Sequence, residues 1–205
     1  MYLVKTPRLL KNLYPALTWD MRPAKPCIYL TFDDGPIPIV TPLVLNILKR
    51  YGAKATFFCI GDNVHKHPAI FEQVKNAGHA IGNHTYNHLR GWDTDDKTYL
   101  DNILKADELL HTHLFRPPYG RVKRSQIKLL KSVKPEINIV MWDVLSGDFD
   151  TTLSPEKCLQ NVLRHTRSGS IVVFHDSLKA LERLEYVLPG AMEIWSKEGY
   201  GFDTL

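Results

Sequence analysis

Short apolar segments alternate with stretches of helical periodicity along most of the chain. The apolar segments are residues 27–32, 55–60, 79–82, 114–116, 137–142, 170–174 and 202–205. This alternation is typical of parallel strands, because the crossover between two parallel strands is usually a helix. We therefore expect an α/β fold with about seven parallel strands, built as a barrel or as a doubly wound open sheet, which periodicity alone does not separate.

The segments between the expected strands carry helix start and stop signals. Four helices are predicted from an opening proline or hydroxyl side chain, at residues 43–51, 69–77, 95–110 and 157–165. A fifth helical region, residues 179–198, contains Pro189-Gly190, which predicts that it is split in two.

Chain length and charge narrow the class of protein. A chain of 205 residues with 44% hydrophobic content is expected to form one domain with a sizeable core. The formal net charge is +4, but lysine and arginine are scattered, so nucleic acid is not an expected partner. Cys27, Cys59 and Cys158 lie in or beside apolar segments without CxxC spacing, which predicts reduced thiols rather than disulfides.

The N-terminal residues do not have the pattern of a signal peptide. Charged residues and Pro7 interrupt residues 1–11 before an apolar stretch of the required length can form. No uncharged apolar run approaches the roughly 20 residues that cross a bilayer. We expect a cytoplasmic protein without a membrane span, although export is not excluded, and the sequence gives no indication of the oligomeric state.

Two adjacent carboxylates, Asp33 and Asp34, directly follow the first expected strand and precede the turn Gly35-Pro36. Ionised carboxylates placed side by side repel each other, so a site that holds both usually contains a metal or an arginine, or shifts their pKa values apart. Taken alone, the string is also typical of an ordinary solvated turn.

His84 and His88 follow the strand expected at residues 79–82. On a helical turn, residues four apart face the same way, so both imidazoles could reach one metal ion. Such a pair also arises by chance in a chain with nine histidines. An aspartate from a neighbouring strand end would complete a set of two histidines and one carboxylate, which leaves coordination positions open for water and substrate.

Two further segments place polar groups after strands. Arg116 precedes the turn Pro117-Pro118-Tyr119, where the guanidinium could hold an ionised carboxylate and the Tyr119 N–H could face a developing oxyanion. Alternatively, Arg116 is an ordinary surface arginine that precedes a proline turn. His175 ends the strand at residues 170–174 and is either a structural histidine or, with an acid holding one ring nitrogen, a general acid.

Five blocks occur in a fixed order, each after an expected strand: TFDDGP at 31–36, HTYNH at 84–88, RPPYG at 116–120, WDVLSGDF at 142–149 and VVFHD at 172–176. Together they resemble the polysaccharide deacetylases of the NodB-homology family. The resemblance covers residues 26–205, leaves residues 1–25 as an N-terminal extension, and implies a distorted (β/α) barrel.

The resemblance implies a role for each matching residue. Asp33 would be the general base, and Asp34, His84 and His88 would be the metal ligands. Arg116 would tether the base, and Tyr119 would donate its N–H to the oxyanion. His175 would be the general acid, and Asp148 would orient it. The fourth block departs from the family pattern, since Phe149 stands where tryptophan is usual and Leu145 where many members have aspartate. Val173 and Trp142 are expected beside the acetyl methyl group, and Tyr119 and Trp92 could stack on a sugar ring.

The function that follows is metal-dependent removal of acetyl groups from N-acetylated amino sugars of the chitooligosaccharide or peptidoglycan type. Zinc is the expected ion, while cobalt, nickel or manganese would also suit the ligand set. Two alternatives stay open: the same scaffold acting on an O-acetyl ester or a non-sugar amide, and a catalytically silent relative that binds carbohydrate.

Overall fold

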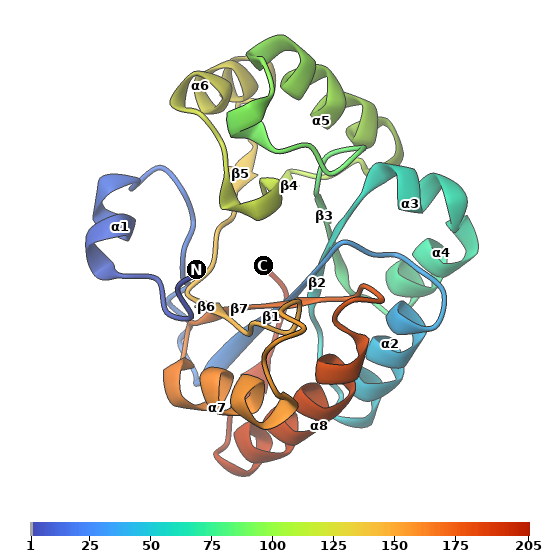
Figure 1. Cartoon of the computed structure of the whole chain (residues 1–205), viewed down its shortest axis with the longest axis vertical. Coiled ribbons are helices and arrows are strands. Elements are labelled where there is room, and N and C mark those ends of the chain that lie inside the picture. The colour runs from blue at the N-terminus through green and yellow to red at the C-terminus, as the bar shows by residue number, and fades with distance from the viewer. Residues whose placement is uncertain (1) are drawn as a thin grey trace.

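The strands form one curled parallel sheet in a computed structural model that describes residues 2–205 (Figure 1). The strand order is β5-β4-β3-β2-β1-β7-β6, and β8 pairs with the start of β1. The strands are β1 Cys27–Asp33, β2 Thr56–Cys59, β3 Ala80–Asn83, β4 Leu114–Phe115, β5 Asn138–Ile139, β6 Val144–Leu145, β7 Ile171–His175 and β8 Gly201–Phe202. The expected barrel-like α/β fold is confirmed, and β6 is a strand that the sequence did not predict.

The helices lie around the outside of the curled sheet (Figure 1). They are α1 Arg8–Leu13, α2 Val40–Arg50, α3 Gly61–Lys66, α4 Pro68–Asn76, α5 Asp96–Leu110, α6 Arg124–Val133, α7 Pro155–His165 and α8 Leu181–Lys197, with short 3₁₀ turns η1 Gly91–Asp93 and η2 Pro118–Gly120. Within residues 2–205, every helix is too short or too polar to cross a membrane.

The predicted break in the last helix is wrong. α8 continues through Pro189, because apolar residues on both sides of the proline are buried against the core. Leu184 and Val187 before it, and Ala191 and Trp195 after it, are at most 2% exposed. The packing of this face outweighs the hydrogen bond that proline cannot donate.

The central strand β1 separates the core from the site. Successive side chains of a strand point to opposite faces, so Phe32 faces the outer helices while Thr31 and Asp33 face the barrel interior. The Phe32 ring stacks on Phe57 and Phe174 at centroid distances of 5.0 and 5.9 Å. This packing fixes β1 in the middle of the sheet and presents Asp33 at its carboxyl end.

Residues 2–20 lie across the open side of the barrel, between the edge strands β5 and β6. Lys5 forms a bridge with Val144 in β6, and Thr18 forms one with Val140 just after β5. The Lys5 ammonium also contacts the Asp143 carboxylate at 2.6 Å. The N-terminal segment therefore joins two strands that do not pair with each other.

Candidate active site

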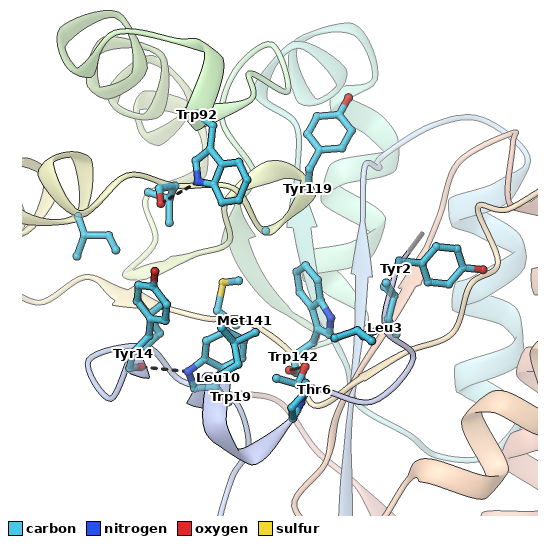
Figure 2. Close-up of a pocket in the computed structure, with 16 residues that line it drawn as sticks. Tyr2, Leu3, Thr6, Leu10, Tyr14, Trp19, Trp92, Tyr119, Met141 and Trp142 are labelled. Carbon is cyan, nitrogen blue, oxygen red and sulfur yellow. Dashed lines mark hydrogen bonds between the residues drawn. The ribbon is translucent and has the colours of Figure 1, made fainter. Parts of the chain in front are cut away.

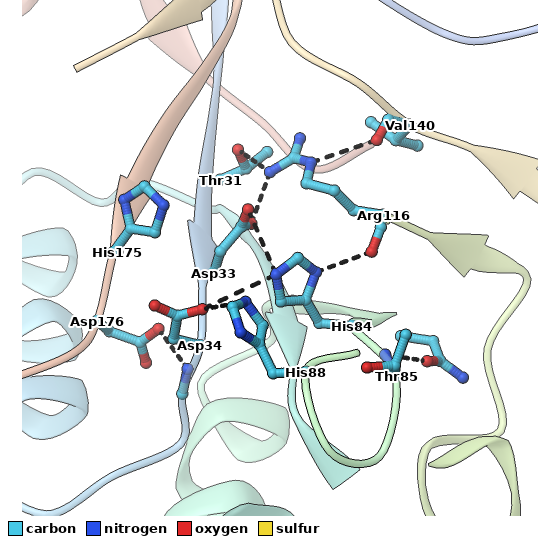
Figure 3. A network of polar contacts seen from close by, with 12 residues as sticks. Thr31, Asp33, Asp34, His84, Thr85, His88, Arg116, Val140, His175 and Asp176 are labelled. Atoms are coloured by element: carbon cyan, nitrogen blue, oxygen red, sulfur yellow. Dashed lines mark hydrogen bonds and ion pairs between the residues drawn. The ribbon is translucent and has the colours of Figure 1, made fainter. Parts of the chain in front are cut away.

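Three residues form a set that could hold a metal ion at the carboxyl ends of β1 and β3 (Figure 3). Asp34 follows β1, His84 follows β3, and His88 lies four residues further on. One donor atom from each lies within 4.8 Å of the others. Asp34 Oδ1 is 3.3 Å from His88 Nε2 and 3.8 Å from His84 Nε2. The fold thus brings together the three predicted ligands.

The segment that carries the two histidines is not the helical turn that we expected. Thr85 and His88 both have left-handed backbone conformations, with φ of 63° and 56°. The Thr85 N–H donates to Asn83 Oδ1 at 2.8 Å, which ties this loop to the end of β3. The two imidazole rings still approach each other, with centroids 5.0 Å apart, but a looped backbone and not a helix places them.

The donor atoms of this set suit a divalent cation. His84 Nδ1 lies 2.8 Å from the carbonyl oxygen of Arg116, which favours a proton on Nδ1 and directs the Nε2 lone pair toward Asp34. Burial lowers the pKa of His84, and burial together with the adjacent His84 lowers the pKa of His88 to about 4. Both rings are therefore neutral at pH 7. Asp34 Oδ1 is buried without a hydrogen-bond partner among residues 2–205, as expected of an atom that coordinates a metal.

Asp33 is held by a buried arginine. The Arg116 Nη1 group donates to Asp33 Oδ1 and to Thr31 Oγ1, each at 2.7 Å. Its other nitrogens donate to the carbonyl oxygens of Val140 and Met141 at 3.3 and 2.9 Å. Burial by itself raises the pKa of Asp33, but Arg116 and the nearby histidines outweigh it and hold that pKa below its usual value. The carboxylate is thus ionised and fixed in orientation.

His175, at the end of β7, is paired with Asp148. His175 Nδ1 lies 2.7 Å from Asp148 Oδ1, and the His175 backbone N–H donates to Asp148 Oδ2 at 2.7 Å. Burial opposes protonation of the ring, yet Asp148 outweighs it and the pKa of His175 is raised to about 9. Phe149 packs edge-on against the His175 ring, with centroids 5.1 Å apart.

Tyr119 lines the site and has a left-handed backbone conformation, with φ of 60°. The residue is 54% exposed, and its ring packs against His88, with centroids 4.7 Å apart. The N–H groups of Gly120 and Arg121 are bonded within the turn, whereas that of Tyr119 has no acceptor in the described part of the chain. The turn therefore leaves one backbone donor free next to the residues that could hold a metal ion.

The possible metal ligands line one cavity of about 560 Å³ together with Asp33 and His175. Trp142 and Leu145 contribute to its wall, as does Tyr119. Two residues expected at the substrate do not line this cavity. Val173 is 1% exposed and packs one layer deeper, beside Thr31 in the parallel register, and Trp92 lines a neighbouring chamber instead.

Two residues that support the site were not foreseen. Asp176 is fully buried, accepts from the Gly35 N–H at 3.0 Å and bonds to the Thr41 hydroxyl at 2.6 Å, so it holds the loop that carries Asp34. Asn63 donates to the carbonyl oxygen of Asp34 at 2.7 Å. A carboxylate directly after the end of β7 was a signal for Asp176, whereas the position of Asn63 follows only from the packing of α3.

Comparisons with known proteins give both sequence relatives and structural relatives of this chain. The family model described as polysaccharide deacetylase matches residues 20–136. A peptidoglycan-N-acetylglucosamine deacetylase of Bacillus cereus is 33% identical over 204 residues, covering 96% of this chain and 95% of the relative. A chitooligosaccharide deacetylase of Azorhizobium caulinodans is 36% identical over 157 residues, 73% of each chain. A crystal structure of a peptidoglycan N-acetylglucosamine deacetylase bound to a naphthyl-benzohydroxamate superposes with a TM-score of 0.88 and 32% identity, covering 98% of this chain and 95% of that one.

Proposed function

Because this chain belongs to the polysaccharide deacetylase family, we propose that it hydrolyses the N-acetyl amide of amino-sugar units in an oligo- or polysaccharide and releases acetate. The relatives that support this proposal are named for peptidoglycan and for chitooligosaccharides. Both substrates present an N-acetylated glucosamine unit, so that unit is the part of the substrate that the proposal specifies.

One observation carries the proposal. A single cavity contains the possible metal ligands Asp34, His84 and His88 beside the arginine-bound Asp33 and the aspartate-bound His175. Amide hydrolysis requires activation of water, stabilisation of an oxyanion and protonation of a poor leaving amine. The presence in this cavity of a candidate group for each of these tasks supports the proposal.

Asp34, His84 and His88 would hold the divalent ion, with zinc as the first choice for a ligand set of this type. A bound ion supplies Lewis-acid chemistry, polarising the acyl carbonyl and making water more acidic. Asp33 acts as the general base that takes the proton of the attacking water. Arg116 keeps Asp33 ionised and holds its Oδ1, which leaves Oδ2 to take the proton.

The remaining groups act when the tetrahedral oxyanion forms and when the amine departs. The unbonded Tyr119 N–H donates to the developing oxyanion. His175 enters the reaction protonated, because its raised pKa of about 9 lies above neutral pH. It gives the Nε2 proton to the departing amine, while Asp148 keeps the other ring nitrogen in place.

The test is acetate release from N-acetylglucosamine tetrasaccharide and from peptidoglycan fragments, with and without a chelator. Release that stops with chelator and returns with zinc is expected. An O-acetylated xylooligosaccharide and a simple aryl acetamide serve as comparison substrates for the ester and non-sugar amide alternatives. Tight oligosaccharide binding without any acid release would instead identify a silent carbohydrate-binding relative.

A further inference from the structure

A second chamber of about 360 Å³ lies next to the catalytic cavity (Figure 2). The N-terminal segment forms one side of it, and the turn that carries Tyr119 forms another. Tyr2, Tyr119, Trp142 and Leu145 line both spaces, so the chamber and the cavity adjoin at these four residues. Its volume is within the usual range for sites that bind small organic groups.

The lining of this chamber is apolar. None of its 16 described lining residues carries a charged side chain. Several polar groups are already bonded to the protein: the Thr6 hydroxyl donates to a backbone carbonyl at 2.7 Å, and the indole N–H groups of Trp19 and Trp92 do so at 3.1 and 3.3 Å. A sugar ring placed here would meet fewer hydrogen-bond partners than in the charged cavity, whereas a hydrocarbon group would gain by leaving water.

The charged residues of the catalytic cavity do not extend into the chamber. Arg90, Arg121 and Lys179 line the cavity but not the chamber. The apolar residues Trp142 and Leu145 line both. A substrate whose polar sugar faces the charged side would therefore direct its apolar acyl substituent toward Trp142 and Leu145, where the two spaces adjoin.

We propose that the chamber receives the alkyl part of an N-acyl group longer than acetyl. The chain would then remove linear acyl groups of about six carbons from amino sugars, in addition to acetyl. This inference rests on the proposed amide hydrolysis and adds the identity of the acyl group. The N-terminal segment becomes a determinant of acyl-chain length, because Leu10 and Thr6 form part of the chamber.

The test compares three substrates built on one glucosamine tetrasaccharide with the zinc-loaded full chain: N-acetyl, N-hexanoyl, and N-acetyl with a hexyl group on the reducing-end oxygen. Released carboxylic acid gives kcat and KM for each. Each buried methylene contributes about fourfold in binding, so we expect the N-hexanoyl KM to be at least about tenfold below the N-acetyl KM. The hexyl glycoside should have the KM of its parent.

Two variants of α1 provide a matched pair. Leu10→Trp fills the chamber from its wall, whereas Leu9→Trp alters a side chain that is 71% exposed and outside the chamber. Leu10→Trp should raise the N-hexanoyl KM about tenfold. It should leave N-acetyl hydrolysis unchanged, which also shows that the variant is folded. Leu9→Trp should change neither substrate.

The outcomes separate this inference from the proposed function. Hydrolysis of the N-acetyl but not the N-hexanoyl substrate overturns the inference and leaves the proposed function standing. The inference is also overturned if only the hexyl glycoside has a lowered KM. The chamber would then bind the alkyl group attached to the sugar and not the acyl group. If none of the three substrates is hydrolysed, both the proposed function and this inference are overturned.

Discussion

The Arg116 guanidinium and the Asp33 carboxylate form a buried ion pair, with Nη1 and Oδ1 2.7 Å apart and both side chains at most 5% exposed. The same arginine donates to two backbone carbonyls and to Thr31, and it lies over the Phe58 ring at 4.1 Å. These hydrogen bonds use most of the N–H groups of the guanidinium. The pair therefore both supports the interior of the barrel and fixes the general base.

Removing the arginine should destabilise the fold as well as stop the reaction. Arg116→Met leaves Asp33 buried without its partner, and such a loss typically costs about 3–5 kcal/mol. Urea unfolding at pH 7 measures the free energy of unfolding. Arg90→Met is the control, because Arg90 is exposed and its loss should cost about 0.5 kcal/mol or less. A loss below about 1 kcal/mol for Arg116→Met would contradict this view of the pair.

The rate should fall at alkaline pH because His175 must be protonated to act as an acid. Its pKa is raised to about 9, so the active form is present below that pH and is lost as pH rises through it. Asp148→Asn removes the charge that raises this pKa, and the alkaline limb of kcat/KM should move to lower pH. Asp203→Asn, at an exposed position, is the control. An alkaline limb that Asp148→Asn does not move would exclude His175 as the group responsible.

The loop that carries Asp34 should tolerate no side chain at Gly35. A Cβ there would overlap the buried carboxylate of Asp176, which holds this loop. Gly35→Ala should therefore weaken zinc binding at least about tenfold and lower the free energy of unfolding by about 1–3 kcal/mol. Gly190→Ala is the matched control, since its Cβ would lie 3.4 Å from Leu159, an ordinary contact. Zinc affinity measured by competition with a chromogenic chelator decides the point, and unchanged affinity in Gly35→Ala would refute it.

The strands that could be predicted are those whose own sequence is apolar and β-branched, such as residues 27–32 and 170–174. β6 could not, because Val144–Leu145 is a strand only through its pairing with β7 and its bridge to Lys5. The continuity of α8 through Pro189 likewise depends on tertiary packing that outweighs a local signal.

The candidate site was also predictable from the sequence only in part. Polar residues after strand ends were predictable, because parallel strands bring their carboxyl ends to one edge and so placed Asp33, Asp34 and His175 together. The role of Asp176 depends on contacts with residues about 135–141 positions away, which no local pattern reveals. The depth of Val173 follows from the register between β1 and β7, which the sequence alone does not specify.

The central claim is that Asp33 and Asp34 have different tasks, one as base and one as metal ligand. The most direct measurement is zinc affinity and acetate release determined side by side for Asp33→Asn and Asp34→Asn. Asp33→Asn should bind zinc within about threefold of the parent chain while losing at least about a hundredfold in kcat. Asp34→Asn should lose both zinc binding and activity. An active Asp33→Asn variant, or an Asp34→Asn variant that binds zinc as tightly as the parent, would contradict the account.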